Sequence, residues 1–411
     1  VLLFSFSGSV SAASVSDIKI AGKAAISIDL DTGEIIYEKN IDNKMYPAST
    51  TKLMTSLLLA ESKKPDDELT YTKSAKNQPE FAWNTNLQKL TVGEKITADN
   101  IMKAMLIYSA NDAAYVAADN VAGSDEAFQK EMNDEVSKLE KSHPYMKNTH
   151  FVTPNGLDTN INNHTTTAYS LSVIAREAFK QQWILNTIKL PETEIKPVNG
   201  PSVKIENRNK LILPDEKLYD KTCLGGKTGY TSKAGKCLVA LFERNNRKIL
   251  GIVMDSIYDS KDETVYNDME KLINYSYSAE KSTLYNKNTT LKTVSANYKL
   301  FKFFGPAKKI NIPLKVENNI TYYDNEVNKT DRAIEYKVPD INVWNIKSSE
   351  SVGNIIIKER DAVKSYNLYA DISNGQVFKM KFPYYMLGAA VLIVIAGLII
   401  TLILRALRSR K

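Results

Sequence analysis

The sequence predicts an α+β domain whose single sheet is built from both ends of the domain, with helices between them. Three observations indicate this fold. Residues 24–40 alternate between apolar and polar side chains around Asp31-Thr32-Gly33, which is typical of a β-hairpin. Residues 225–254 hold three more strand patterns, and helical patterns fill much of the stretch between them. Strands at both ends of a helical middle favour an antiparallel sheet flanked by a helical cluster.

Local signals place the individual elements. Thr97 and Asp99 are typical of a helix start, and Gly123 is typical of a helix end. The Ser-Lys-Ala-Gly run after residue 231 predicts a turn between two strands. The predicted helices are 49–60, 98–108, 112–121, 166–181 and 263–277, and the predicted late strands are 225–231, 236–243 and 249–254.

A second region, residues 282–378, has a different pattern of apolar and polar residues. Short alternating runs are broken by Asn, Asp, Gly and Pro, which predicts a small β-rich domain. We find no cluster of nucleophiles in this region. We therefore interpret it as a spacer between a membrane and the first domain.

The last part of the chain predicts a membrane span. Residues 382–404 contain no charged side chain, and as a helix they would extend roughly 34 Å, enough for a bilayer core. Tyr384 and Tyr385 stand where interfacial aromatic residues belong, and the basic segment 405–411 follows. A buried core helix would not normally be followed by such a basic end. We expect 405–411 to be cytoplasmic and everything before Lys381 to be outside.

The first thirteen residues resemble the end of a secretory signal. An apolar stretch is followed by small residues, with plausible cleavage after Ala12 or Ala13. No Met or basic leader precedes it, so we expect the printed sequence to lack the start of this leader. The alternative is a buried N-terminal strand. On the main interpretation, the first domain covers residues 14–278.

Charge and cysteine content exclude several classes of function. The net charge of +7 is spread over lysines throughout 411 residues, without an Arg-rich stripe, so a nucleic-acid partner is not supported. In the predicted hairpin, Cys223 and Cys237 lie roughly 23 Å apart, too far for a disulfide. We interpret both as packing residues, and the sequence predicts no metal site.

Histidine offers little for catalysis. None of His143, His150 and His164 has the sequence context of a serine-hydrolase triad. We expect His164 to cap or pack against the helix that follows it.

Three short motifs in a fixed order carry the chemistry. They are Ser49-Thr50-Thr51-Lys52, Ser109-Ala110-Asn111 and Lys227-Thr228-Gly229. Each is weak alone, since Ser-x-x-Lys and Ser-x-Asn both recur elsewhere in the chain. Lys-Thr-Gly occurs only once, and the ordered set gives the specificity.

The first motif supplies a nucleophile and a base. Ser49 and Lys52 are three residues apart at the start of a predicted helix, so their side chains share one face. A serine hydroxyl needs a base, and lysine can serve only when its amine is neutral. Burial and a second cation, here Lys227, would both lower the pKa of Lys52. For an isolated motif, a capping serine and a solvated lysine would be the better interpretation.

The other two motifs predict relay and binding groups. Ser109 can pass a proton to a leaving amine, and Asn111 can hold a substrate amide and orient Lys52. Lys227 and Thr228 begin an extended strand that can bind a peptide by strand addition and contact its terminal carboxylate. The alternatives are a capping Asn-Asp pair for the second motif and a lysine-bearing edge strand for the third.

These motifs resemble those of the penicillin-binding protein and serine β-lactamase superfamily. The chain is most similar to the low-molecular-mass D-alanyl-D-alanine carboxypeptidases, peptidase family S11, over about residues 20–277. Two further motifs support the resemblance: Thr153-Pro154-Asn155-Gly156-Leu157 and Asn207-Arg208-Asn209. The β-rich region and the membrane anchor also suit that family. The resemblance implies a β-lactamase-like catalytic domain.

The resemblance also implies roles for individual residues. Ser49 would be the acylated nucleophile, Lys52 its base and Ser109 the proton relay. Lys227 and Thr228 would bind the D-Ala carboxylate. The backbone N–H groups of Ser49 and Tyr230 would form the oxyanion hole, and Arg208 would be a structural or supporting cation. No cofactor is implied, and the expected partners are peptidoglycan stem peptides ending in D-Ala-D-Ala and β-lactam antibiotics.

One departure and several alternatives stay open at this point. The family often has an arginine where a loose alignment puts Val265, and Lys261 could replace it. A β-lactamase would need a second base; the nearest motif, at Glu270, has the wrong position and an Ile in place of Leu. A cross-linking transpeptidase usually has a larger N-terminal region. An inactive wall-binding module would tend to lose the residues that are intact here.

Overall fold

The computed structural model describes residues 18–79 and 90–409, so the leader expected at residues 1–13 lies outside the described residues. The chain divides into two compact units. The first holds the chain up to Glu280 together with two later segments, Tyr323–Thr330 and Arg360–Ala362. The second holds Lys281–Tyr322, Asp331–Glu359 and the chain from Val363 onward.

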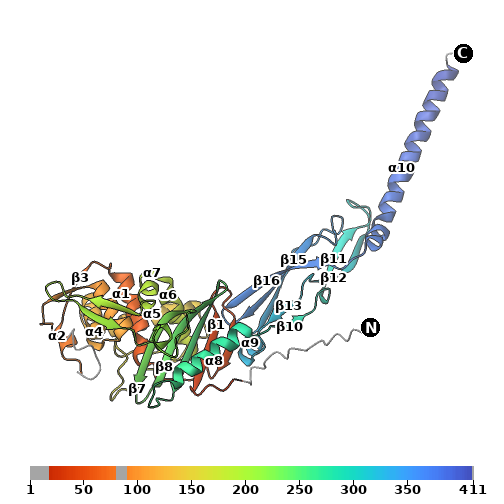
Figure 1. Cartoon of the computed structure of the whole chain (residues 1–411). Helices are drawn as coiled ribbons and strands as arrows, with labels where there is room; N and C mark the ends of the chain where they lie inside the picture. The colour runs from red at the N-terminus through yellow and green to blue at the C-terminus, as the bar shows by residue number, and fades with distance from the viewer. Residues whose placement is uncertain (1–17, 80–89, 410–411) are drawn as a thin grey trace, which may run out of the picture. The chain divides into compact units, whose positions relative to one another are not determined.

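The first unit contains the predicted sheet (Figure 1). Its five antiparallel strands come from both ends of the domain, and Ile26 of the first strand pairs with Ile252 of a late one. The prediction that the sheet joins the two ends is therefore confirmed. The strand order is β2 (Ile35–Lys39), β1 (Ala24–Asp29), β9 (Arg247–Ser256), β8 (Gly235–Arg244) and β7 (Cys223–Thr231).

Helices cover both faces of this sheet. One face packs against α8 through apolar residues such as Phe242 and Met269, and the other packs against the central helices. The predicted helices are present, but α2, α5 and α7 were not predicted. The helices are α1 (Lys52–Ser62), α2 (Lys73–Lys76), α3 (Ala98–Lys103), α4 (Asn111–Ala122), α5 (Asp125–Ser142), α6 (Ala168–Lys180), α7 (Gln182–Ile188) and α8 (Thr264–Ser278).

Two small antiparallel sheets lie beside the helices. They pair β3 (Glu68–Thr70) with β4 (Lys95–Thr97), and β5 (Glu192–Ile195) with β6 (Val203–Glu206). The end of the predicted helix 98–108 differs from a regular α-helix, because Ala104–Tyr108 form a π-helical turn.

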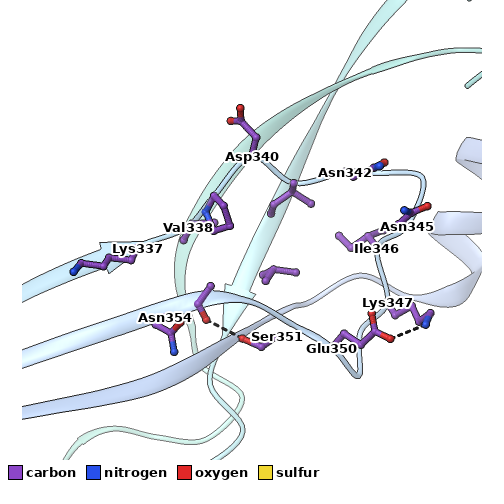
Figure 2. A pocket seen from close by; sticks show the side chains of 14 residues that line it. Lys337, Val338, Asp340, Asn342, Asn345, Ile346, Lys347, Glu350, Ser351 and Asn354 are labelled. Carbon is purple, nitrogen blue, oxygen red and sulfur yellow. Dashed lines mark hydrogen bonds and ion pairs between the residues drawn. The ribbon is translucent and has the colours of Figure 1, made fainter. Parts of the chain in front are cut away.

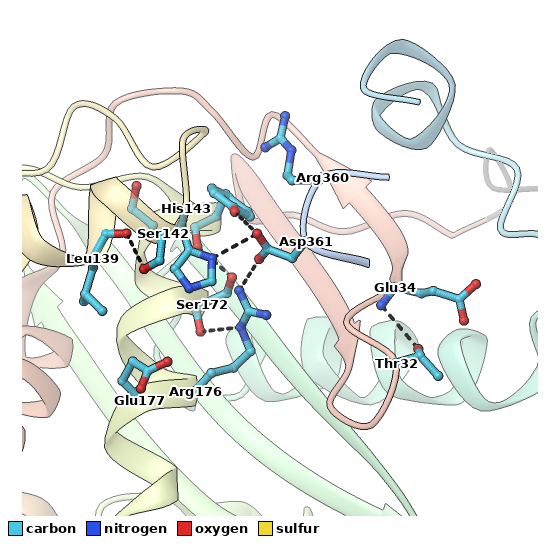
Figure 3. A network of polar contacts seen from close by, with 12 residues as sticks. Thr32, Glu34, Leu139, Ser142, His143, Ser172, Arg176, Glu177, Arg360 and Asp361 are labelled. Atoms are coloured by element: carbon cyan, nitrogen blue, oxygen red, sulfur yellow. Dashed lines mark hydrogen bonds and ion pairs between the residues drawn. The ribbon is translucent and has the colours of Figure 1, made fainter. Parts of the chain in front are cut away.

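The two later segments of the first unit have polar contacts for which the sequence gives no signal. Asn328, in the short helix α9 (Glu326–Thr330), donates a hydrogen bond to the carbonyl of Ile35. The Asp361 carboxylate contacts His143 Nδ1 at 3.0 Å and also contacts Arg176 (Figure 3). Burial alone would raise the pKa of Asp361, but the His143 hydrogen bond and the Arg176 charge hold it well below its ordinary value.

The second unit is rich in strands, as its sequence predicts. A five-stranded sheet has the order β11 (Thr290–Lys299), β12 (Ala307–Lys315), β16 (Ala362–Ala370), β15 (Ser351–Glu359) and β14 (Ala333–Lys337), and β10 (Ser282–Tyr285) pairs with β13 (Ile320–Tyr322). A cavity of about 780 Å³ lies along the connection from β14 to β15. Figure 2 shows the side chains that line it, including Lys347, which pairs with Glu350.

The chain ends in a long helix, α10 (Asn374–Arg408). It begins before the predicted span 382–404, because Ser373 and Gln376 form a capping box at its start. The helix is long and apolar enough to cross a membrane, and its apolar window is not buried against the rest of the protein.

Candidate active site

The fold brings the three sequence motifs together around one serine. Ser49 lies in a 3-10 turn, Ala48–Thr51, that leads directly into α1. Lys52 Nζ is 3.0 Å from Ser49 Oγ, so the prediction that the two side chains share a face and form a hydrogen bond is confirmed.

The amine of Lys52 is fully buried and surrounded by oxygen atoms. Besides Ser49 Oγ, Nζ contacts Asn111 Oδ1 and the backbone carbonyl of Asn155, each at 2.8 Å. Burial, followed by the charge of Lys227, lowers the pKa of Lys52 well below its ordinary value. Both causes are those expected from the sequence.

Ser109 is held at the end of the π-helical turn. The wider turn lets Ala110 N donate to Ala104 O at 2.9 Å, and it leaves Ser109 in the left-handed region with φ of 69°. A residue other than glycine rarely adopts this conformation, and such strain gathers at functional sites. As a result, Ser109 Oγ accepts a hydrogen bond from Lys227 Nζ at 2.9 Å.

Strand β7 presents the third motif to the serine. Lys227 is only 1% exposed, and its Nζ also donates to the carbonyl of Thr228. Burial, together with the charges of Arg208 and Lys236, lowers the pKa of Lys227 to about 7. At Gly229, a Cβ atom would lie 2.9 Å from Ser49 N, so only glycine lets the strand lie this close to the serine turn.

A cleft of about 850 Å³ opens over these groups. Six of the predicted site residues line it: Ser49, Ser109, Asn111, Arg208, Thr228 and Tyr230. The two lysines, Lys52 and Lys227, lie behind its wall. Arg208 stacks on the ring of Tyr108 at 4.1 Å from the centroid, which keeps its guanidinium at the cleft.

Sequence reasoning missed the loop that completes the floor of the site. The Asn155 carbonyl contacts Lys52, and a Cβ atom at Gly156 would lie 1.9 Å from Ala48 O, so the loop packs directly on the serine turn. The motif at 153–157 could have indicated this, because an Asn-Gly pair favours a tight turn.

His164 supports the same turn and does not form a triad. Its Nε2 contacts Thr51 Oγ1 at 2.9 Å, and its Nδ1 accepts a hydrogen bond from Val152 N. Burial lowers the pKa of His164 to about 3, so the ring is neutral. The expectation that His164 caps the following helix is wrong, because Thr167 caps α6; His164 contacts the serine turn and the segment 151–153 instead.

A buried carboxyl lies next to the amine of Lys52. Asp112 accepts a hydrogen bond from the Tyr71 hydroxyl at 3.2 Å, and burial raises the pKa of Asp112 to about 7. A fully ionised Asp112 would favour a protonated Lys52, so burial of this carboxyl helps to keep the amine neutral.

Neither of the two positions considered for a cation after the third strand, Val265 and Lys261, lines the cleft. Val265 lies in α8 and is buried in the core. Lys261 is not among the residues that line the cleft. Lys236 does line it, and its Nζ pairs with Asp262 at 2.6 Å. Sequence reasoning gave no role to Lys236, because its approach to the cleft depends on the β7–β8 pairing.

Both cysteines are buried and free, in agreement with their predicted packing role. Cys237 pairs with Gly229, whereas Cys223 pairs with Phe242 at the other end of the hairpin.

A family model described as D-alanyl-D-alanine carboxypeptidase, Peptidase_S11, matches residues 10–257. The chain belongs to the peptidase S11 family of D-alanyl-D-alanine carboxypeptidases. Among its relatives, the carboxypeptidase DacF of Bacillus subtilis is 28% identical over 84% of this chain and 83% of its own length. DacD of Escherichia coli is 31% identical over 56% of this chain, and the match spans only 57% of that relative.

Solved structures of penicillin-binding proteins share this carboxypeptidase fold. Penicillin-Binding Protein D2 from Listeria monocytogenes, in its ampicillin-bound form, matches with a TM-score of 0.53 and 28% identity over 64% of this chain and 99% of that chain. The carboxypeptidase DacD from Francisella tularensis matches with a TM-score of 0.61 and 21% identity over 87% of this chain and 94% of that chain. The predicted penicillin-binding, β-lactamase-like fold is confirmed.

Replacing Gly229 by alanine tests the close approach of β7 to Ser49. The added methyl group would press on Ser49 N and Thr50 N, so we expect acylation by penicillin to slow by about 100-fold, the effect of a displacement near 1 Å. The variant is expected to unfold thermally within a few degrees of the parent. Gly200→Ala, which adds its methyl group against Pro197, is the control. Parent-like acylation of the Gly229 variant would contradict the inferred steric role.

Proposed function

We propose that Ser49 removes the terminal D-Ala from peptidoglycan stem peptides through an acyl-enzyme, with Lys52 as its base. The observation that carries this proposal is the set of three contacts around the Lys52 amine. Family membership supports the reaction class, and the D2 protein of Listeria monocytogenes has been solved in an ampicillin-bound form.

The three contacts of Lys52 can be satisfied by a neutral amine, the form that its lowered pKa favours. An uncharged amine has two N–H bonds and one lone pair, whereas an ammonium group has three N–H bonds and no lone pair. Asn111 Oδ1 and the backbone carbonyl oxygen of Asn155 can only accept hydrogen bonds, so they take the two N–H bonds. The lone pair is then left for the Ser49 hydroxyl, and Lys52 can take its proton.

Acylation then proceeds without a cofactor. Ser49 Oγ attacks the carbonyl carbon of the penultimate D-Ala as its proton moves to Lys52 Nζ. Backbone N–H groups of Ser49 and Tyr230 stabilise the oxyanion. The C–N bond to the terminal D-Ala breaks, and the leaving amine receives a proton through Ser109. Water then attacks the ester and returns free Ser49 with the shortened peptide.

The terminal carboxylate of the substrate requires positive charge in the cleft. Thr228 lines the cleft, and the buried Lys227 stands behind it. Arg208 also lines the cleft and is held by Tyr108, whereas Lys236 is already paired with Asp262. We therefore assign the carboxylate to Thr228, Lys227 and Arg208.

A β-lactamase activity is not favoured. The carboxylate that could have served as the second base, Glu270, lies on α8 and is not among the residues that line the cleft. An acyl-enzyme with penicillin is therefore expected to be long-lived, which suits inhibition by β-lactams.

We also propose that α10 anchors the protein in a bacterial cell membrane as a single span. Its length and apolar composition support this, and the basic residues at its end favour a cytoplasmic location for the tail. The catalytic unit then acts outside the cytoplasm, where peptidoglycan lies.

Substitution of Ser49 and Lys52 tests the proposed chemistry. We expect Ser49→Ala to abolish the penicillin adduct and Lys52→Ala to slow its formation by ~10³-fold, as loss of a general base does. Intact-mass analysis, peptide mapping and D-Ala release from an acyl-D-Ala-D-Ala peptide are the measurements. Lys64→Ala, an exposed lysine just beyond α1, is the control. An adduct outside Ser49, or parent-rate acylation of Lys52→Ala, would exclude this mechanism.

The pH profile tests the role of Lys227. Its pKa in the free enzyme is about 7, so its ammonium is present below that pH and is lost above it. We expect kcat/KM for the peptide to fall as pH rises above about 7. The change in kcat is expected to be smaller, because a bound carboxylate stabilises the ammonium. Lys227→Arg keeps its charge and should move the fall to higher pH. A kcat/KM that rises steadily into alkaline pH would refute this role.

Substitution of Arg208 tests the carboxylate site. We expect Arg208→Gln to raise KM for the peptide by about 10-fold with little change in kcat, since a charge-assisted contact is lost. Lys236→Gln is the matched control, and its effect should be smaller because Asp262 already neutralises that lysine. A larger rise in KM for the Lys236 variant would reverse the assignment.

A further inference from the structure

The hairpin that joins β11 to β12 ends in an apolar tip that is exposed to solvent. Phe303 is 71% exposed and Phe304 is 55% exposed. The ring of Phe304 stacks on that of Phe301 at 5.4 Å, and the exposed Phe303 is its neighbour in the sequence. Exposed aromatic residues gathered at one point are typical of an interaction surface.

Lysines surround this tip. Lys302 lies over the ring of Phe303, with Nζ 5.1 Å from the centroid, and Lys299, Lys308 and Lys309 are exposed on the adjoining strands. The sequence from 281 to 316 contains eight lysines and no Asp or Glu. The surface therefore combines an apolar tip with neighbouring lysines. The tip suits the apolar edge of an anionic bilayer, and the lysines suit its negative headgroups.

Ring contacts place the tip beside the start of the long apolar helix. Tyr298 lies opposite Lys308, one pair before the last pair of the hairpin. The ring of Tyr298 contacts Trp344 at 6.4 Å, and Trp344 contacts Tyr384 of α10 at 5.3 Å. Tyr384 stands at the start of the uncharged stretch 382–404, the depth at which aromatic residues meet headgroups. All these residues belong to the second unit.

We propose that the tip 300–306 is a second membrane contact, in which Phe303 and Phe304 enter the headgroup layer of an anionic bilayer and the neighbouring lysines bind its phosphates. This inference rests on the proposed membrane anchoring by α10. A helix alone leaves the attached unit free to tilt, whereas two points of contact fix its orientation to the membrane. The lysines make this second contact depend on the charge of the lipid.

A polarity-sensitive fluorophore at position 303 tests the contact. The full-length chain with Phe303→Cys is labelled, while the native Cys223 and Cys237 are buried and stay unlabelled. The labelled chain is then inserted into vesicles of phosphatidylglycerol and phosphatidylcholine. We expect a blue-shifted emission and about a twofold loss of intensity with a headgroup nitroxide lipid. Vesicles of phosphatidylcholine alone should give a smaller shift.

Val363→Cys supplies the matched control. Val363 is 61% exposed and lies at the start of β16. The strand ends seven residues later, at Ala370, and α10 begins shortly after that residue. That separation is roughly 23 Å along the strand. A probe at position 363 should emit as in water and resist the nitroxide. Unchanged thermal unfolding of the labelled chains, together with unchanged penicillin acylation, confirms that both units of each variant are folded.

Separate readouts distinguish the tip from the anchor. Flotation of the chain with the vesicles reports on α10, whereas emission from position 303 reports on the tip. A chain that floats while its 303 probe stays water-like overturns the second contact and leaves the anchor intact. An emission shift that disappears on dilution of the protein in excess lipid would assign the tip to contacts between copies and would also overturn it. An equal shift in neutral vesicles would overturn the role of the lysines.

Discussion

Burial of the Lys52 amine is the constraint on which the rest of the site depends. Away from water, a charged amine loses its hydration, so the neutral form that can accept a proton is favoured. This burial requires cover from three directions: the serine turn, the start of α4 through Asn111, and the loop at Asn155. Each is a separate element, and the site exists only where they meet. The helical cluster and the sheet are thus both needed for the proton transfer that we propose.

The site is held together largely by backbone segments that lie very close to the serine turn. At Gly156 and Gly229, a Cβ atom would meet backbone atoms of the serine turn, so these two positions let a loop and a strand press on it from different sides. Neutral His164 holds Thr51 in the same turn. A short 3-10 turn has few hydrogen bonds of its own, and its geometry is fixed by these neighbours. The position of Ser49 Oγ is therefore set by packing over long sequence separations.

The sequence predicted the sheet, most of the helices and the three motifs that meet around Ser49, because those depend on local periodicity and on residue types in a fixed order. Long-range contacts were less accessible. The role of the Asn155 carbonyl is a backbone feature, and the Lys236–Asp262 pair forms only when β8 meets the loop before α8. Asp361 joins the first unit from far along the chain. Helix α5 could have been found, since Phe128, Met132, Val136 and Leu139 recur at helical spacing.

In the proposed mechanism, the two buried lysines have different tasks: Lys52 takes a proton, and Lys227 carries a positive charge. Two ammonium groups so close together in a medium of low polarity repel one another, so they cannot both hold a proton cheaply. In the proposed mechanism, Lys52 is neutral in the resting site, and Lys227 is charged below a pH of about 7. When Lys52 takes the Ser49 proton, this repulsion appears at once and favours passing a proton onward. Ser109, bonded to Lys227 at 2.9 Å, stands where that proton can reach the leaving amine. In the proposed mechanism, the electrostatic cost created by nucleophilic attack therefore favours departure of D-Ala, because the buried pair releases that cost when the proton moves on through Ser109.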